Sequence, residues 1–184
     1  MKVWNLQRDL AGLLIVDVQE KLIAYEDRSA DVLKSIQMMI KGFRILGLPI
    51  VVTEQYPQGL GSTVAGIKCL LGDQQNYLTK TSFSCMGDPH IQSEILNIGV
   101  SQWVVVGIEA HVCVLQTAKD LLEAKCDVVV LNDAITSRSI YDFSTAIAEM
   151  RDCGIRISSC ETVLFELLKN SEAAEFKKIS QLVK

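Results

Sequence analysis

The chain contains little histidine. Two histidines, His90 and His111, occur among its 184 residues. They are not spaced for a shared metal site, because a zinc centre needs several nitrogen or sulfur ligands brought together. We therefore expect no metal and no other cofactor.

Long apolar runs are also missing. No run approaches the roughly 20 residues that a helix needs to span a bilayer. The N-terminal segment, Met1–Asp9, has no apolar core before a cleavage site. We expect no membrane association, and a soluble protein located in the cytoplasm.

Basic residues do not gather anywhere along the chain. The 18 Lys and Arg residues are outnumbered by 22 Asp and Glu residues, for a net charge of −4. A surface that follows phosphates concentrates Lys and Arg in one region. Nucleic acid is therefore not an expected partner.

Paired cysteine motifs are absent too. No two cysteines form a C-x-x-C pair, and a chain of this length does not need disulfides in order to fold. We interpret all six as reduced thiols: Cys69, Cys85, Cys113, Cys126, Cys153 and Cys160.

Apolar side chains, by contrast, are plentiful. They make up 49% of the residues and give a mean hydropathy of +0.25, which is enough for a substantial core. No repeat, linker or low-complexity segment divides the chain. We expect residues 1–184 to form a single domain.

Short apolar runs alternate with helical patterns along the whole chain. This alternation is typical of a parallel sheet covered on both faces, so the sequence predicts an α/β fold with three layers and a doubly wound, mainly parallel sheet of about six strands. We expect strands at 10–16, 50–53, 77–79, 102–106, 128–131 and 155–158. We expect helices at 31–47, from 89, after 113 to 126, at 139–154 with Ser139 as the start of a capping box, and from 161 to the end, with a loop and one short helix over 55–75.

Cys113 lies where an apolar strand ends at a glycine and a helix begins. In the first turn of a helix, a thiol feels the positive end of the backbone dipole, which favours the thiolate and lowers the pKa. The alternative is a small, buried core residue, which is a common role for free cysteine.

Two other reactive side chains follow predicted strands in the same way. Asp17 follows the first strand and Lys80 the third, and parallel sheets bind ligands outside the carboxyl ends of their strands. A carboxylate can take the proton of Cys113, and a nearby ammonium lowers a thiol pKa. Asp17 as a turn cap, Lys80 as a solvated lysine and Cys113 as a core residue are the alternatives.

Five segments together resemble a known family. Asp17–Gln19, Lys80–Ser84 and Gly107–Val114 resemble the three signature segments of the isochorismatase-like cysteine hydrolases, in the same order and with similar spacing. Thr53–Gly61 and Asp133–Ser139 resemble the isochorismatase domain-containing branch of bacteria and animal mitochondria. The similarity covers nearly the whole chain.

The resemblance implies a role for each of these residues. Asp17 would be the general base, Lys80 would orient it and hold the thiolate, and Cys113 would attack a carbonyl to give an acyl-enzyme. A cis peptide bond would join Ile108 and Glu109. The N–H groups of Glu109 and Cys113 would then form the oxyanion hole. Members of the superfamily are usually homo-oligomers, so we expect a dimer or a larger assembly.

The chain also departs from parts of the superfamily. Nicotinamidases bind a metal through histidines after the second strand, whereas Glu54–Gln58 contains none, so a metal-assisted nicotinamidase is disfavoured. Isochorismatases proper cleave a vinyl ether without the cysteine, and the presence of Cys113 favours cleavage of an amide or another acyl compound. Ether hydrolysis with Asp17 as the acid, and a non-catalytic module that binds a small molecule or a partner, remain alternatives.

The substrate itself stays open, beyond being a small molecule. Several side chains near the strand ends are candidates for contacting it, and each has a structural role as its alternative. For Arg138 the choice lies between an anionic substrate group and an acidic neighbour. The candidates are Gln19, Gln55, Tyr56, Phe83, His111 and Arg138.

Overall fold

A sheet of six parallel strands lies at the centre of the protein, in a computed structural model that describes residues 4–184. The order of the strands is β3-β2-β1-β4-β5-β6. The predicted α/β fold, with a doubly wound parallel sheet of six strands, is confirmed. The strands are β1 (Ala11–Val16), β2 (Ile50–Gln55), β3 (Tyr77–Lys80), β4 (Gln102–Ile108), β5 (Asp127–Thr136) and β6 (Arg156–Ser158).

The chain enters this sheet in the middle. From β1 it runs outward through β2 to β3, returns to β4 beside β1, and then runs outward the other way through β5 to β6. Sheets wound in this way bind ligands in the crevice between the two central strands, outside their carboxyl ends. We call this region the central crevice. Asp17 follows one of its two strands, and the segment that holds Cys113 follows the other.

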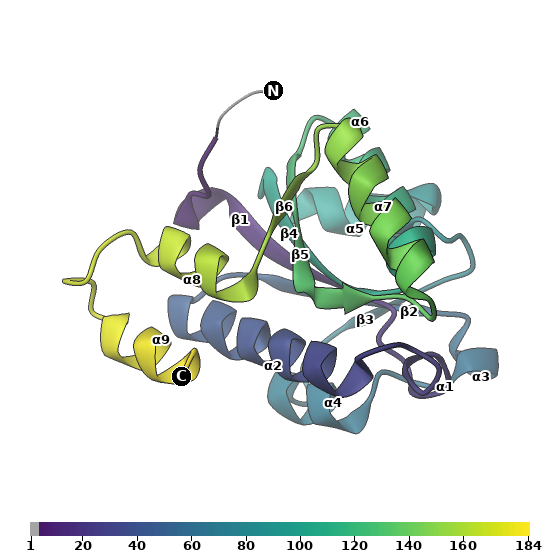
Figure 1. The fold of residues 1–184 in the computed structure, drawn as a ribbon, viewed down its shortest axis with the longest axis horizontal. Helices are drawn as coiled ribbons and strands as arrows, with labels where there is room; N and C mark the ends of the chain where they lie inside the picture. Colours follow the sequence, from purple (N-terminus) through teal and green to yellow (C-terminus); the bar gives the residue numbers. More distant parts are fainter. Residues whose placement is uncertain (1–3) are drawn as a thin grey trace.

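Helices cover both faces of the sheet, which gives the three layers seen in Figure 1. One face carries α2 (Ser29–Leu46), α4 (Ala65–Leu71), α8 (Cys160–Leu168) and α9 (Phe176–Leu182). The other face carries α5 (Pro89–Asn97), α6 (Leu115–Glu123) and α7 (Ile140–Asp152). The short helices are α1 (Glu20–Ile23) and α3 (Pro57–Leu60), with 3-10 turns at Arg8–Leu10 and Cys85–Gly87.

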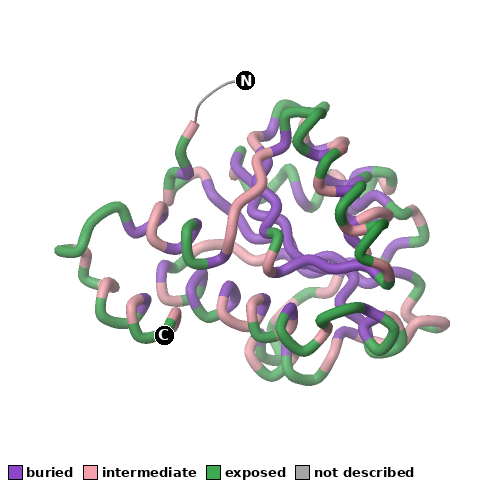
Figure 2. Tube along the Cα trace, in the orientation of Figure 1, coloured by how far each residue is buried: buried purple, intermediate pink, exposed green. Residues whose placement is uncertain are grey.

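Two apolar clusters fill the spaces between the layers, because successive strand residues point to opposite faces of a sheet. In β1, Leu13 and Ile15 pack on the side of α2. Leu14 and Val16 pack on the side of α6. All four are fully buried, and each contributes roughly 1.5–3 kcal/mol by leaving water. Figure 2 shows this burial along the central strands, and it explains why they are continuous apolar runs in the sequence.

Capping residues mark the ends of several helices, including the one start at which the sequence predicted a cap. At the start of α7, the hydroxyl of Ser139 accepts a hydrogen bond from the N–H of Tyr141, as the capping pattern predicted. Asp88 accepts one from the N–H of His90 at the start of α5. Helix α2 ends at Gly47, whose φ of 70° is the left-handed conformation that glycine adopts without strain.

The segment 55–75 contains two short helices, α3 and α4, instead of the one that was expected. They end at Gly61 and Gly72, whose φ angles of 80° and 76° stop each helix after one or two turns. Elements this short show too little periodicity for the sequence to reveal them.

Two further boundaries differ from the prediction. Strand β5 continues to Thr136. Its pairing with β4 is interrupted after Val130 by a shift in register and resumes at Ile135. The helix expected from residue 161 to the end is interrupted after α8, where Lys169 adopts a φ of 70°. It resumes as α9.

The described residues include no helix that is both long enough and apolar enough to cross a membrane. The expectation that Met1–Asp9 is not a leader concerns a segment whose first three residues lie outside the described part.

Candidate active site

Asp17 lies at the central crevice, immediately after β1. Its side chain is fully buried, and its φ of 52° is a left-handed conformation that Asp adopts more readily than most residues. The hydroxyl of Thr53 donates a hydrogen bond to Oδ1 at 2.7 Å. Nζ of Lys80 lies 2.6 Å from Oδ2. Both carboxylate oxygens are therefore held in place by neighbouring strands.

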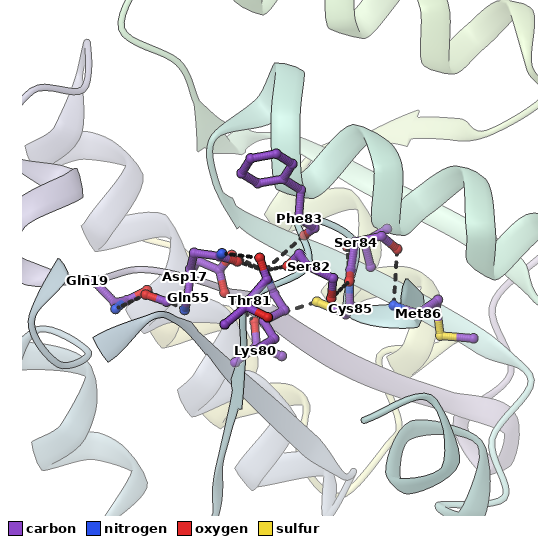
Figure 3. A network of polar contacts seen from close by, with 12 residues as sticks. Asp17, Gln19, Gln55, Lys80, Thr81, Ser82, Phe83, Ser84, Cys85 and Met86 are labelled. Carbon is purple, nitrogen blue, oxygen red and sulfur yellow. Dashed lines mark hydrogen bonds and ion pairs between the residues drawn. The ribbon is translucent and has the colours of Figure 1, made fainter. Parts of the chain in front are cut away.

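Lys80 is the last residue of β3, and Figure 3 shows its side chain among oxygen atoms. Its Nζ donates to Asp17 Oδ2 at 2.6 Å, to Gln55 Oε1 at 2.7 Å, and to the carbonyl oxygens of Phe83 and Ser82 at 2.9 and 3.2 Å. Burial lowers the pKa of Lys80, but the charge and hydrogen bond of Asp17, together with the influence of Cys85 and Cys113, outweigh burial and raise the pKa above its ordinary value. Lys80 therefore carries its positive charge at neutral pH.

Gln19 and Gln55 support this pair from inside the protein. Gln19 accepts a hydrogen bond from the N–H of Gln55 at 2.7 Å and donates to the carbonyl of Gly61 at 2.6 Å. Gln55 donates to the carbonyl of Thr81 at 2.8 Å, which turns its Oε1 toward Lys80. The sequence suggested both glutamines as substrate contacts. In the structure both are buried and bonded within the site, as the alternative structural role requires.

Cys113 lies in a π-helical turn, Ala110–Val114, that leads into α6. It is 6% exposed, and both the carboxylate of Asp17 and the ammonium of Lys80 act on its thiol. The prediction of a lowered pKa is wrong for this resting arrangement. Burial and the negative charge of Asp17 raise the pKa of Cys113, and Lys80 offsets only part of that rise. The resting residue is a thiol.

The segment between β4 and Cys113 is held by both its backbone and its side chains. The peptide bond between Ile108 and Glu109 is cis, as the family resemblance implies. The carbonyl of Glu109 accepts hydrogen bonds from the N–H groups of Val112 and Val114 at 3.1 and 3.2 Å. Its carboxylate pairs with Nε of Arg138 at 2.7 Å. Arg138 therefore has the acidic neighbour that was one of its two alternatives.

Three other candidate side chains are more accessible. Tyr56 and Phe83 are 54% and 55% exposed. The carbonyl of Phe83 contacts Lys80, while its ring points away from the charged group (Figure 3). His111 is partly buried, with Nδ1 2.9 Å from the hydroxyl of Ser137. The structure thus leaves these three at the surface, unlike the two glutamines.

Two residues of the site carried no signal in the sequence. Thr53 bonds Asp17, and the thiol of Cys85 lies 3.6 Å from the hydroxyl of Thr53. Cys85 is fully buried, which raises its pKa to about 11. In the sequence, Thr53 is only the last residue of the strand expected at 50–53. Nothing around Cys85 indicates that its thiol lies near Thr53 and Asp17.

No group of three or more His, Cys, Asp or Glu side chains within residues 4–184 is placed to hold a metal ion. The carboxylate of Asp17 and the thiol of Cys85 are instead bonded to Lys80 and Thr53.

Known proteins are similar to this chain in both sequence and fold. The isochorismatase domain family matches residues 11–162. A Danio rerio protein named isochorismatase domain-containing protein 1 is 36% identical over 181 residues, which are 98% of this chain and 63% of that protein. The chain therefore spans less than two-thirds of that relative's length.

Solved structures are similar as well. A structure described as the MAR1 ribonuclease from Caenorhabditis elegans has a TM-score of 0.91 and 36% identity, and covers 98% of this chain and 92% of its own. The Escherichia coli YcaC gene product, described as an octameric hydrolase of unknown specificity, has a TM-score of 0.92 over 99% and 91% of the two chains. At 20% identity, that second likeness concerns the fold alone.

Proposed function

The chain belongs to the isochorismatase family, and on that premise we propose that it is a cysteine hydrolase that cleaves a small amide without a metal. The observation that supports this most directly is the position of the Cys113 thiol, which lies close enough to Asp17 and Lys80 to feel the charges of both, while the carboxylate of Asp17 is bonded to Lys80 and Thr53. A nucleophile, a proton acceptor and a fixed positive charge therefore lie at one end of the sheet.

The first half of the reaction forms the acyl-enzyme. Sulfur of Cys113 attacks the carbonyl carbon while Asp17 takes the thiol proton, and the carbonyl electron pair moves to oxygen. The N–H groups of Glu109 and Cys113 stabilise that oxyanion. The intermediate then collapses, the C–N bond breaks, and the proton passes from Asp17 to the leaving amine. A thiol with a raised pKa suits this sequence, because its proton leaves only as the new bond forms.

The second half releases the acid. Asp17 takes a proton from water, whose oxygen attacks the acyl carbon, and the C–S bond breaks. The sulfur of Cys113 recovers the proton. Lys80 keeps its charge throughout, and so offsets the negative charge that passes between carboxylate, sulfur and oxyanion.

As part of the same proposal, we assign the side chains that contact the substrate. Tyr56, Phe83 and His111 would form the walls that contact the substrate, since Tyr56 and Phe83 are exposed and His111 is partly accessible near the strand ends. Arg138 is exposed as well, but it is already paired with Glu109. The partner is a small molecule and not a nucleic acid, in keeping with the net charge of −4.

We further propose a homo-oligomer of one-domain subunits in the cytoplasm. The octameric state described for the YcaC relative supports an assembly, and the six free cysteines fit a reducing compartment. Light scattering at micromolar concentration tests the assembly, and a single monomeric species would contradict it.

The test of the chemistry is a search for the covalent intermediate. Wild-type protein is incubated with a panel of small amides and esters, and its intact mass is recorded before and after. We expect an acyl adduct that maps to Cys113, present in the Cys69→Ala control and absent, together with turnover, in Cys113→Ala. Cys69 suits the control because it is an exposed thiol.

Retained turnover in Cys113→Ala would overturn the thiol mechanism. An isochorismate-like vinyl ether separates the remaining alternative. If Cys113→Ala cleaves it and Asp17→Ala does not, the reaction is ether hydrolysis with Asp17 as the acid.

A further inference from the structure

A second carboxyl group lies against Glu109 and takes no part in the steps above. Glu26 is 7% exposed, although it follows a short surface helix. Its Oε2 is buried and has no hydrogen-bond donor among the described residues. The carboxyl of Glu109 lines the same pocket as Glu26 and acts on it. The side chain of Glu109 is itself only 15% exposed, so the two carboxyl groups repel each other unless one of them carries a proton.

Backbone contacts fix Glu26 in this position. The next residue, Asp27, donates its N–H to the carbonyl of Ser137 at 3.2 Å, and the hydroxyl of Thr136 donates to the carbonyl of Asp27 at 2.6 Å. The loop after α1 is thereby attached to the end of β5. Thr136 pairs with Ile108 of β4, so Glu26 is held beside the strand end from which Glu109 emerges.

The charged groups around Glu26 supply little positive charge that could stabilise its ionised form. Arg138 pairs with Glu109, but its side chain is 62% exposed and water screens it. Glu20 and Lys21 of α1 line the same pocket, of about 690 Å³, and their charges oppose each other. Asp142 of α7 acts on Arg138 from the other side.

Glu26 is therefore protonated up to neutral pH. Burial, followed by the charge of Glu109, raises the pKa of Glu26 to about 7, and Arg138 lowers it only in part. The protonated carboxyl donates a hydrogen bond to Glu109, which also accounts for the oxygen that finds no other donor.

We propose that Glu26 is a positioning residue for the oxyanion hole: its protonated carboxyl and the guanidinium of Arg138 grip the side chain of Glu109 from two sides and so fix the N–H of Glu109 relative to Cys113. The proposal rests on the proposed function, in which that N–H binds the developing oxyanion. The carbonyl of Glu109 is already held by the turn that contains Cys113. Contacts to the side chain as well as to the carbonyl restrict the conformation of Glu109, and with it the direction of its N–H.

Two reactions of the same thiol separate this role from a general structural one. Acylation of Cys113 by p-nitrophenyl acetate builds an oxyanion and needs the N–H donors. Alkylation of Cys113 by iodoacetamide displaces iodide, builds no oxyanion and does not need them. Loss of folding, or of access to the thiol, changes both rates together. A misplaced donor changes acylation alone.

We expect Glu26→Ala to lower the acylation rate by about tenfold or more while alkylation at Cys113 stays within about twofold of wild type. In Glu26→Gln the amide N–H replaces the shared proton, so acylation should recover. Glu20→Ala, which removes a carboxylate from the same pocket without touching Glu109, should leave the ratio of the two rates unchanged.

The pH profile gives a second readout. In wild type, the ratio of acylation to alkylation should fall as pH rises through about 7, because Glu26 loses the proton that it shares with Glu109. In Glu26→Gln the ratio should not change over that range, because the amide does not titrate.

The results also separate the two proposals. If p-nitrophenyl acetate does not acylate Cys113 of the wild type, the proposed function fails. If it does, and Glu26→Ala changes neither rate or both rates equally, or if Glu26→Gln keeps the wild-type pH profile, the role of Glu26 is overturned while the proposed function stands.

Discussion

The buried pair of Asp17 and Lys80 matters more to the site than to the stability of the fold. Taking two such charges out of water costs several kcal/mol for each ion, and their attraction repays this only with good geometry and further hydrogen bonds. Thr53 and Gln55 provide those bonds. In the proposed function, the role of the pair is chemical, because Asp17 accepts the proton of the nearby Cys113 thiol.

Replacing Asp17 with asparagine tests that acceptor without changing the size of the side chain. We expect Asp17→Asn to be acylated by p-nitrophenyl acetate about 10²–10⁴-fold more slowly than wild type. It should also lose about 3–5 kcal/mol of unfolding free energy, because Lys80 stays buried without its counter-charge. Release of p-nitrophenolate and urea denaturation measure the two effects. Asp31→Asn, on the exposed side of α2, is the control, and unchanged acylation in Asp17→Asn would contradict the role of Asp17.

The protonation state of Cys113 is a separate residue-scale prediction. Burial and the charge of Asp17 raise the pKa of this thiol above its ordinary value. The ultraviolet absorbance of thiolate, recorded as the difference between wild type and Cys113→Ala, should therefore be missing at neutral pH and appear only above the range in which exposed thiols titrate. A thiolate signal at neutral pH would show instead that Lys80 and the helix dipole dominate.

The sequence predicted that Asp17, Lys80 and Cys113 lie near one another, but not what surrounds them. Asp17, Lys80 and Cys113 could be found because each follows a strand, and parallel strands end at one edge. The direction of the Cys113 pKa could not, since it depends on burial and on which charge lies nearer. Glu26 could not either, because its burial against Glu109 is created by contacts between segments far apart in the chain.

Among the secondary-structure elements, the contact between β1 and β4 sets the geometry of the crevice. Gly107 of β4 has a φ of 125° and lies so close to β1 that a Cβ would be 2.1 Å from the carbonyl oxygen of Val16. Only glycine fits both the conformation and the space. The residues after it, including Glu109 and Cys113, depend on this close approach for their position.

Gly107→Ala should therefore destabilise the protein by at least about 2 kcal/mol and also slow acylation of Cys113. Gly99→Ala is a matched control: its φ of 80° is strained for alanine as well, but nothing lies within 4 Å of the added Cβ. Its cost should be about 1 kcal/mol, with acylation unchanged. Urea denaturation and p-nitrophenolate release measure both variants. Equal costs for the two would mean that the contact with Val16 is unimportant.

Prediction from the sequence succeeded for elements with long, buried patterns. All six strands and helix α2 were found, because continuous apolar runs and a 3.6-residue period are strong signals. The extension of β5 was missed because Asn132 and Asp133 look like the end of a strand. Asp133 is in fact bonded through both carboxylate oxygens to the N–H of Cys160, at the start of α8. A contact of that kind leaves no local pattern.

For the molecule as a whole, strand register brings the parts of the site to one level. Val16 pairs with Gly107 across β1 and β4, and Gln55 pairs with Lys80 across β2 and β3. Asp17, which follows Val16, therefore lies at the level where β4 ends. Lys80 extends its side chain to Asp17 from β3, two strands away from β1. A shift of one residue in either pairing would separate the carboxylate from the ammonium or the thiol.

Burying so many thiols should make the molecule sensitive to alkaline pH. Burial raises the pKa of four thiols in the native state above the ordinary value of a cysteine, to about 11 for Cys85, whereas the thiols of an unfolded chain titrate near the ordinary value. Their contribution to stability is complete below pH 9 and declines above it, because the unfolded state then binds fewer protons than the native state. The thiols are Cys85, Cys113, Cys126 and Cys160.

The melting temperature, measured under reducing conditions between about pH 8 and pH 10.5, should therefore fall as pH rises. Lysine and tyrosine residues also titrate in this range, so the thiol part needs its own comparison. A double variant, Cys126→Ala with Cys160→Ala, removes two of the four shifted groups outside the active site and should show a shallower fall. Cys69→Ala with Cys153→Ala, which removes two exposed thiols, should keep the wild-type slope. If both double variants decline in parallel with wild type, the buried thiols do not control the alkaline stability of the fold.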